Sequence, residues 1–272
     1  MFDIELVCKI ALNAGKEIMH IYNSAKEIHV VHKSDDSPLT KADLASHSLI
    51  LEQLLSVYPE IPLVSEEGHH GDPNKSQYSW LVDPLDGTKE FIKRNGMFTV
   101  NIALMQKIDD RWKPVLGVVH APATSQTWIG SDGSPAFAID SQGRRRISVN
   151  EVHNEPVRIV ASGSHRSKID EEFADNVGKH ELIRMGSSIK ACAVADGTAD
   201  IYPRFGPTSC WDTAAAHAIV SSAGGNILDP EGNDLDYDIV NEILNPFFIV
   251  TSNNQWVERW IACQDYNYRC SD

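Results

Sequence analysis

The most informative segment of the chain reads Trp80-Leu81-Val82-Asp83-Pro84-Leu85-Asp86-Gly87-Thr88. We expect an apolar strand at 78–82 that ends at Asp83. Pro84 fixes one backbone angle and removes a donor, and Gly87 permits conformations that other residues resist, so a sharp turn is expected next. Such a turn can bring the side chains of Asp83 and Asp86 together.

Two further acids stand at comparable places in the chain. Glu66 follows a short apolar run, and Asp212 opens a predicted helix, which are usual places for ligand groups in α/β proteins. Acids gathered in one place repel each other unless a cation sits between them, and oxygen ligands suit Mg²⁺. Two such ions ~3.5–4 Å apart can clamp the attacking and leaving oxygens of a phosphoryl displacement. The N–H groups near Gly87 and Thr88 are free to face an anion.

Each of these residues also has a purely structural explanation. Asp83 and Asp86 are of a type common in turns, and Glu66 belongs to a Glu-Glu pair that solvent can cover. Asp212 can cap the helix that follows it. Asp43 fits the acid of a capping box that begins at residue 40. Taken one at a time, only the Asp-Pro-Leu-Asp-Gly-Thr block points beyond local structure.

Composition limits the class of protein. The 272 residues include 24 basic and 38 acidic side chains, a formal charge of −14, and 42% are hydrophobic. These values are ordinary for a globular protein of one or two domains. The acidic balance argues against a general nucleic-acid binder and against electrostatic docking to an anionic membrane.

Neither a membrane span nor a disulfide framework is expected. No apolar run approaches the ~20 residues of a spanning helix, and residues 1–5 lack the basic region of a signal peptide. The 5 cysteines contain no C-x-x-C, which excludes a tidy disulfide framework and the usual zinc spacings. A reducing cytoplasm is the simplest location.

Hydrophobic patterning predicts two halves. The first is expected to hold helices at 6–21 and 41–58, strands at 61–64, 78–82, 98–105, 115–120, 127–129 and 136–139, and a surface loop at 68–77. The second is expected to alternate strands at 158–161, 182–185 and 199–202 with helices at 170–177, 189–196 and 213–223. We therefore place a boundary near residue 145, which gives an α+β half, 1–145, and an α/β half, 146–272.

Two segments near the C-terminal end carry weaker signals. The acidic stretch 231–238 is expected to be a solvated turn. The tail 256–272 contains an apolar face made by Trp256, Val257, Trp260 and Ile261. A helix packed on its own domain explains this face better than a self-association surface does.

Two sequence blocks resemble those of a known family. Residues 80–88 and 211–215 resemble the two signature motifs of the inositol monophosphatase superfamily, which comprises lithium-sensitive, magnesium-dependent phosphatases. Residues 86–96, 98–104 and 202–208 are closer to its bacterial CysQ-type branch, the 3′(2′),5′-bisphosphate nucleotidases. The resemblance runs from the first helix to about residue 250. It implies a layered α-β-α-β-α sandwich of the inositol monophosphatase and fructose-1,6-bisphosphatase type.

The resemblance also implies roles for the acids. The implied metal ligands are Glu66, Asp83, the Leu85 carbonyl, Asp86 and Asp212. Asp83 would bridge two metals. Thr88, paired with Asp43, would orient the nucleophilic water and accept its proton. The amides of Gly87 and Thr88 would hold the scissile phosphate.

Three residues outside the motifs are candidates for the rest of the substrate. Ser187 precedes a predicted helix and could seat an anion, while Lys190 and Arg204 could reach a 5′-phosphate or the base. A helix cap and surface charges explain them equally well. The dipeptide 165–166, His-Arg, is a weaker candidate. The expected substrate-binding positions are Glu66, Leu85, Asp86, Gly87, Thr88, Ser187, Lys190, Arg204 and Asp212.

The reaction implied by the resemblance is hydrolysis of the 3′-phosphate of adenosine 3′,5′-bisphosphate to AMP and phosphate. It would need two or three Mg²⁺ ions and would be inhibited by Li⁺. The nucleotide is the expected partner, and the oligomeric state stays open. Bacterial relatives are associated with the inner face of the cytoplasmic membrane, for which this acidic chain offers no reason.

Other functions stay open to different degrees. The same superfamily includes inositol monophosphatases and sugar bisphosphatases, and the chemistry would be unchanged. A non-catalytic metal-binding regulator is disfavoured by the full set of acids together with Thr88 and Asp43. A Walker-type kinase and a serine esterase are excluded, because neither G-x-x-x-x-G-K-[ST] nor G-x-S-x-G occurs.

Overall fold

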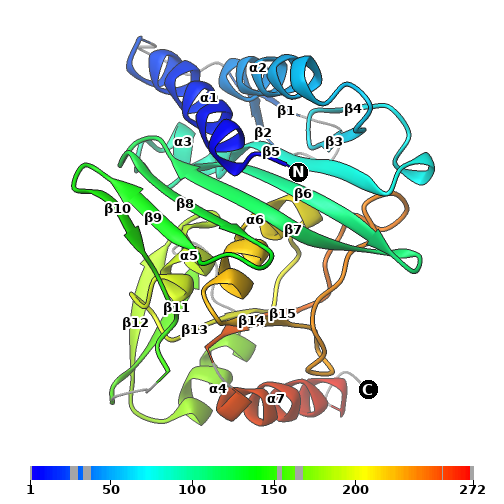
Figure 1. The fold of residues 1–272 in the computed structure, drawn as a ribbon. Helices are drawn as coiled ribbons and strands as arrows, with labels where there is room; N and C mark the ends of the chain where they lie inside the picture. The colour runs from blue at the N-terminus through cyan, green and yellow to red at the C-terminus, as the bar shows by residue number, and fades with distance from the viewer. Residues whose placement is uncertain are drawn as a thin grey trace.

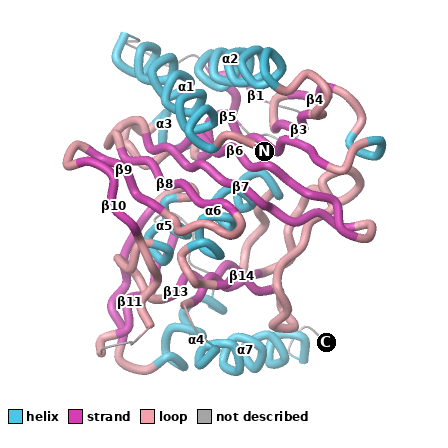
Figure 2. Tube along the Cα trace, viewed as in Figure 1, coloured by secondary structure: helices cyan, strands magenta, loops and turns pink. Residues whose placement is uncertain are grey.

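Helices and sheets alternate in five layers. The structure, a computed structural model, describes residues 2–24, 30–32, 38–151, 155–162, 168–252 and 254–269. The helical layers are, in order, α1 (Ile4–Ser24) with α2 (Lys41–Val57), α5 (Ile189–Ala195) with α6 (Cys210–Ser222), and α4 (Lys168–Val177) with α7 (Val257–Arg269) (Figure 1). An eight-stranded sheet lies between the first two helical layers and a five-stranded sheet between the last two (Figure 2). The expected α-β-α-β-α sandwich is confirmed.

The larger sheet has the strand order β10-β9-β8-β7-β6-β5-β3-β4. Its strands are β3 (Leu63–Ser65), β4 (Gly68–His70), β5 (Tyr78–Asp86), β6 (Thr99–Ile108), β7 (Arg111–Ala121), β8 (Gln126–Ser131), β9 (Phe137–Asp140) and β10 (Gly143–Arg146). Neighbouring strands are antiparallel except β3 and β5, which run parallel. The carboxyl ends of β3 and β5 therefore meet at one edge.

The smaller sheet has the order β12-β11-β13-β15-β14. Its strands are β11 (Val157–Ser162), β12 (His180–Met185), β13 (Ile201–Arg204), β14 (Asn226–Leu228) and β15 (Phe248–Thr251). A separate hairpin pairs β1 (Val30–His32) with β2 (Pro38–Thr40), and single helical turns are α3 (Thr88–Ile92), η1 (Pro73–Lys75) and η2 (Asn254–Trp256). The parallel pairing of β11 with β12 and with β13 gives this half its α/β character.

Helix α6 lies unusually close to the larger sheet. It crosses β7 and β8 where those strands carry Gly117 and Gly130. A Cβ atom on Gly117 would come within 2.0 Å of the Ala215 carbonyl oxygen, and one on Gly130 within 2.7 Å of the Ile219 Cα atom. The glycines thus let an alanine-rich helix from the second half pack directly on the sheet of the first half.

Several expectations about local structure need correction. Strand β5 does not end at residue 82 but continues through the motif to Asp86, because β6 pairs with Asp83 and, after a bulge, again with Asp86. Residues 68–77 are not only a loop, since β4 pairs with β3 there. The stretch 231–238 is not simply a solvated turn, because Leu235 and Tyr237 are buried and Tyr237 bridges to Trp112.

The tail helix packs on its own chain, as expected. Trp256 and Trp260 are buried, and the Trp260 ring lies 4.8 Å from that of Phe205. The proposed division near residue 145 falls within β10, the edge strand of the larger sheet, and stays a proposal. Cys8, Cys192 and Cys210 are free and buried, Cys263 is buried, and residue 270 lies outside the described part. None of the helices among the described residues is long and apolar enough to cross a membrane.

The contact between Gly117 and α6 makes a prediction about stability. We expect Gly117→Ala to lower the free energy of unfolding by about 2 kcal/mol or more, because the added methyl meets backbone rather than a movable side chain. Gly206→Ala is the control, since its methyl reaches only ordinary contact with Arg204 at 3.5 Å. Urea unfolding measures both. Equal stability of the two variants would contradict the close packing.

Candidate active site

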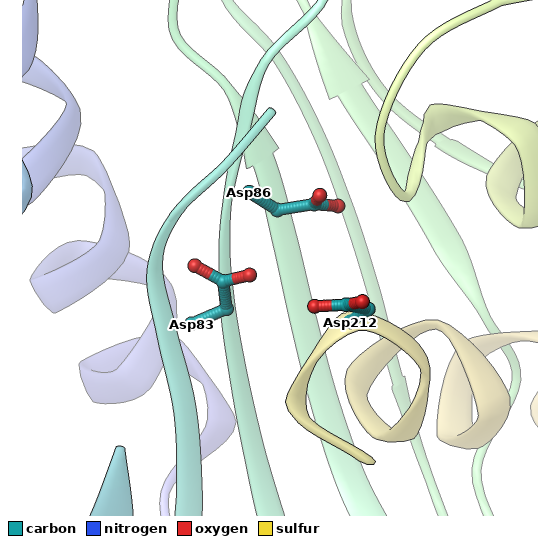
Figure 3. A group of neighbouring side chains, drawn as sticks. All are labelled: Asp83, Asp86 and Asp212. Atoms are coloured by element: carbon teal, nitrogen blue, oxygen red, sulfur yellow. The ribbon is translucent and has the colours of Figure 1, made fainter. Parts of the chain in front are cut away.

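Three carboxylates from two halves of the chain converge at the end of β5. Asp83 and Asp86 come from β5 and Asp212 comes from the first turn of α6 (Figure 3). Each offers a carboxylate oxygen, and these oxygens lie within 4.8 Å of one another. An oxygen-only set at this spacing is one that a hard divalent cation fits.

A bulge in β5 places both of its acids on one side. In a regular strand, residues three apart point to opposite faces. Here Asp83 pairs with Asn101 and Asp86 pairs with Thr99, so three steps along β5 match two steps along β6. The extra residue changes the alternation, which a β-bulge does in general. Both carboxylates can therefore face the start of α6.

Asp212 serves its own helix as well as the cluster. The Ser209 backbone N–H donates to Asp212 Oδ2 at 2.9 Å, as in a capping box. The capping role considered from the sequence is thus present. It occupies one carboxylate oxygen and fixes the side chain beside Asp83 and Asp86.

Burial and mutual repulsion define the electrostatics of the cluster. Burial raises the pKa of Asp83 well above its ordinary value, and the charges of Glu66, Asp86 and Asp212 raise it further. Burial, followed by the charge of Asp86, raises the pKa of Asp212 to about 7. The protein by itself supplies too little positive charge here, so a divalent cation matches the donor set.

The other two expected metal ligands lie at the edge of this cluster. Glu66 directly follows β3, and its N–H donates to the Val82 carbonyl at 3.2 Å, which sets it next to Asp83. Its carboxylate is not one of the three that meet within 4.8 Å. Leu85 is buried within the bulge, and its carbonyl oxygen accepts from the Thr88 hydroxyl at 3.4 Å.

Asp43 and Thr88 meet across the N-terminal half. The Thr88 hydroxyl donates to Asp43 Oδ1 at 3.2 Å. Asp43 Oδ2 accepts from the Thr40 N–H at 2.8 Å and from the Thr40 hydroxyl at 2.6 Å, so the capping box coexists with this contact. Burial raises the pKa of Asp43, which suits a group that accepts a proton near neutral pH.

A cavity of about 720 Å³ opens from the carboxylates toward the second half. It is lined by Asp86, Gly87, Ser187, Lys190, Arg204 and Asp212 among others. Ser187 has a positive φ of 45°, and its buried hydroxyl has no hydrogen-bond partner among the described residues. The buried Nε of Arg204 likewise lacks one there, although its Nη2 donates to the Pro207 carbonyl at 2.9 Å.

Lys190 is a buried cation in the floor of this cavity. Its ammonium donates to the Ser187 carbonyl at 2.7 Å and lies 5.4 Å from the centre of the Tyr202 ring. Burial lowers the pKa of Lys190 to about 8. The candidate residues 165–166 lie outside the described residues.

Sequence reasoning missed two polar residues beside the carboxylates. Ser188 and Asn101 both donate to Asp86 Oδ2. One signal was available: Asn101 is a polar residue in the middle of a strand that is otherwise apolar and buried.

Comparison with known proteins agrees with this arrangement. A family model described as the inositol monophosphatase family matches residues 3–262. The chain belongs to this family. The curated 3′(2′),5′-bisphosphate nucleotidase CysQ of Salmonella typhimurium is 46% identical over 250 residues, which cover 91% of this chain and 99% of that protein. The family is metal-dependent, and the three-carboxylate cluster can hold a metal ion.

Solved structures of the family share the fold. CysQ from Bacteroides thetaiotaomicron aligns with a TM-score of 0.78 at 36% identity, covering 92% of this chain and 97% of that one. An IMPase from Thermotoga maritima aligns with a TM-score of 0.79 over 97% and 98% of the two chains, and at 23% identity it bears on the fold alone.

The raised carboxylate pKa values predict how pH acts on metal-free protein. A carboxyl group whose pKa is higher when folded stabilises the fold at low pH, and this contribution is lost as pH rises. We expect protein held in EDTA to lose stability between about pH 4 and about pH 7, through the pKa of Asp212. Asp83→Asn is expected to raise its free energy of unfolding at pH 7.5 by on the order of 1–3 kcal/mol.

Urea unfolding across this pH range measures the effect. Asp132→Asn, which removes an exposed acid from the turn after β8, is the matched control and is expected to change little. A lower stability of Asp83→Asn than of the parent at pH 7.5 would contradict repulsion within the cluster.

Proposed function

We propose that the protein is a metal-dependent 3′(2′),5′-bisphosphate nucleotidase that hydrolyses the 3′-phosphate of adenosine 3′,5′-bisphosphate to AMP and phosphate. The observation that carries the proposal is the convergence of Asp83, Asp86 and Asp212 beside a cavity with a buried cation. The 46% identity to a CysQ nucleotidase over 91% of the chain supports the choice of substrate.

The metal would be Mg²⁺, in two or three positions. The proposed ligands are Glu66, Asp83, the Leu85 carbonyl, Asp86 and Asp212, and their all-oxygen chemistry supports a hard cation. When bound, Mg²⁺ supplies charge that acidifies a coordinated water and neutralises the phosphate oxygens. Li⁺ is expected to inhibit by occupying one of these positions.

Asp43 and Thr88 are the proposed proton-handling pair. The Thr88 hydroxyl donates its hydrogen bond to Asp43 Oδ1. The lone pairs of the Thr88 oxygen can therefore accept a hydrogen bond from the attacking water. As the water passes a proton to the Thr88 oxygen, the hydroxyl proton of Thr88 passes to Asp43, and the raised pKa of Asp43 supports this role. Water held in this way attacks phosphorus in line with the departing 3′-oxygen.

The cavity is the proposed nucleotide site. The amides of Gly87 and Thr88 would hold the scissile phosphate at the metal end. Ser187, Lys190 and Arg204 would bind the 5′-phosphate or the base at the other end. Support comes from the buried Ser187 hydroxyl and Arg204 Nε, which have no hydrogen-bond partner within the described part of the chain, since buried donors without partners are rare.

The proposed location of the protein is the cytoplasm. Buried free thiols support a reducing compartment such as the cytoplasm. No feature of the described residues supports the association with the membrane that was expected from relatives, so it is not proposed.

Phosphate release tests the function directly. With Mg²⁺ we expect kcat/KM for adenosine 3′,5′-bisphosphate to exceed that for inositol 1-phosphate or fructose 1,6-bisphosphate by at least about tenfold. Millimolar Li⁺ is expected to lower the rate. Asp83→Asn should reduce kcat by about 10³-fold or more, and Asp132→Asn should leave it unchanged. A preference for inositol 1-phosphate would overturn the proposed substrate. Absence of phosphate release from every substrate would overturn the enzymatic function and favour a non-catalytic metal-binding protein.

The role of Arg204 can be tested separately. If its guanidinium contacts the 5′-phosphate, Arg204→Gln should raise KM for the bisphosphate about tenfold and change adenosine 3′-monophosphate hydrolysis much less. Arg146→Gln, on the exposed edge strand β10, is the control. An equal loss on both nucleotides would assign Arg204 to another part of the substrate or to the loop at Pro207.

A further inference from the structure

Four hydrogen-bond donor atoms meet at one oxygen of Asp86. Asp86 Oδ2 accepts from the Ser188 N–H at 2.7 Å and from the Ser188 hydroxyl at 2.9 Å. The Asn101 amide donates to the same oxygen at 3.3 Å. The Thr99 hydroxyl lies 3.4 Å from it. The donors come from the N-cap residue of α5 and from β6.

The Ser188 hydroxyl also reaches the helix that carries Asp212. Its oxygen lies 2.5 Å from the backbone carbonyl oxygen of Asp212 and accepts from the Asn101 amide at 2.8 Å. The hydroxyl has a single hydrogen, so at any moment it donates either to Asp86 Oδ2 or to the Asp212 carbonyl oxygen. Ser188 and Asn101 are buried, at 5% and 1% exposed, so water does not compete for these bonds.

These hydrogen bonds hold Asp86 in place against the repulsion from the neighbouring carboxylates. Asp86 carries a charge near Asp83 and Asp212 and would lower its energy by rotating away from them. Donors that all meet Oδ2 fix the rotation, and they leave the other oxygen for a cation. The bond to the Asp212 carbonyl ties the same serine to the start of α6. The spacing of the acids from both halves therefore depends on these two side chains.

We propose that Ser188 and Asn101 are positioning residues that set the metal affinity of the carboxylate cluster by holding Asp86 in register with Asp212. The inference rests on the metal-dependent part of the proposed function. Neither residue touches the reacting atoms. Removing a group that orients a metal ligand lowers metal affinity by about 10–100-fold in other sites, which gives the size of the expected effect.

The test measures metal binding without substrate. Calorimetric titration of Mn²⁺ and Mg²⁺ into the full chain gives Kd for the parent, Ser188→Ala, Asn101→Ala and the double variant. We expect Kd to rise about tenfold or more in each single variant. We expect the double variant to be weaker than the parent by less than the product of the two factors, because both residues serve one network.

Further measurements separate positioning from a general loss of structure. Ser188→Thr keeps the hydroxyl and should retain a Kd within about threefold of the parent. Ser79→Ala removes a buried serine hydroxyl from the other end of β5, where it reaches the Pro62 carbonyl, and should leave Kd unchanged. At saturating Mg²⁺, kcat of the two alanine variants should return to within about threefold of the parent.

Each outcome bears on a different statement. A parent protein that binds no divalent ion would overturn the proposed function itself. A parent that binds, with variants of unchanged Kd, would overturn the positioning role alone. Weakening by Ser79→Ala equal to that by Ser188→Ala would show that any lost buried hydroxyl suffices, and would also overturn it. If Ser188→Ala does not fold, the Asn101→Ala titration decides the question.

Discussion

Repulsion among buried carboxylates is the constraint on which the rest of this site depends. Asp83, Asp86 and Asp212 lie with oxygens within 4.8 Å, and burial makes their charges costly. A chain left to itself would separate or protonate such groups. Their persistence therefore requires a framework that prevents separation and a cation that offsets the charge. The fold supplies the framework. The cation, when bound, suits the cluster to phosphate chemistry.

The framework works by bringing two halves of the chain into direct contact. The bulge in β5 turns Asp83 and Asp86 to the same side, and Gly117 and Gly130 let α6 lie against the sheet. As a result Asp212 arrives from a segment more than a hundred residues away. The Asp43–Thr88 contact stands on the first half alone, while the cavity floor at Lys190 comes from the second. The candidate site is therefore assembled between the two.

Much of the fold was predictable because its signals are local. The helical spacing of Val7, Ile10, Ala14 and Ile18 predicted α1, and these residues are buried. The layered sandwich followed from the family resemblance rather than from patterning. The bulge was not predictable, because strand register depends on a partner, β6, that the motif does not contain. Leu235 and Tyr237 are buried, and they alternate with polar residues as in a half-buried strand. The acidic residues around them pointed instead to a solvated turn.

The site was predictable in its members but not in their connections. The motifs named Asp83, Asp86 and Asp212, yet the convergence of these residues is a long-range property of the fold. Ser188 lies outside the motifs and Asn101 lies within the block 98–104, but neither was assigned a role there, and their proposed role follows only from the distances to one oxygen of Asp86. Asp212 and Asp43 illustrate a second point: taken alone, each acid was explained by helix capping, and each one caps its helix while it also lies in the carboxylate cluster or contacts Thr88.

The place of α6 between the two sheets also bears on how the protein is made. The strands of the larger sheet end at residue 146, but the helix that covers its inner face begins at residue 210. Trp128 and Val119 share a core with Ala215 and Ile219, so that face stays uncovered while the intervening residues are synthesised. A nascent chain of this length presents a wide apolar surface on the ribosome, where such surfaces aggregate or recruit chaperones. The inner face of the larger sheet therefore stays exposed during synthesis until α6 has been made and has packed on it.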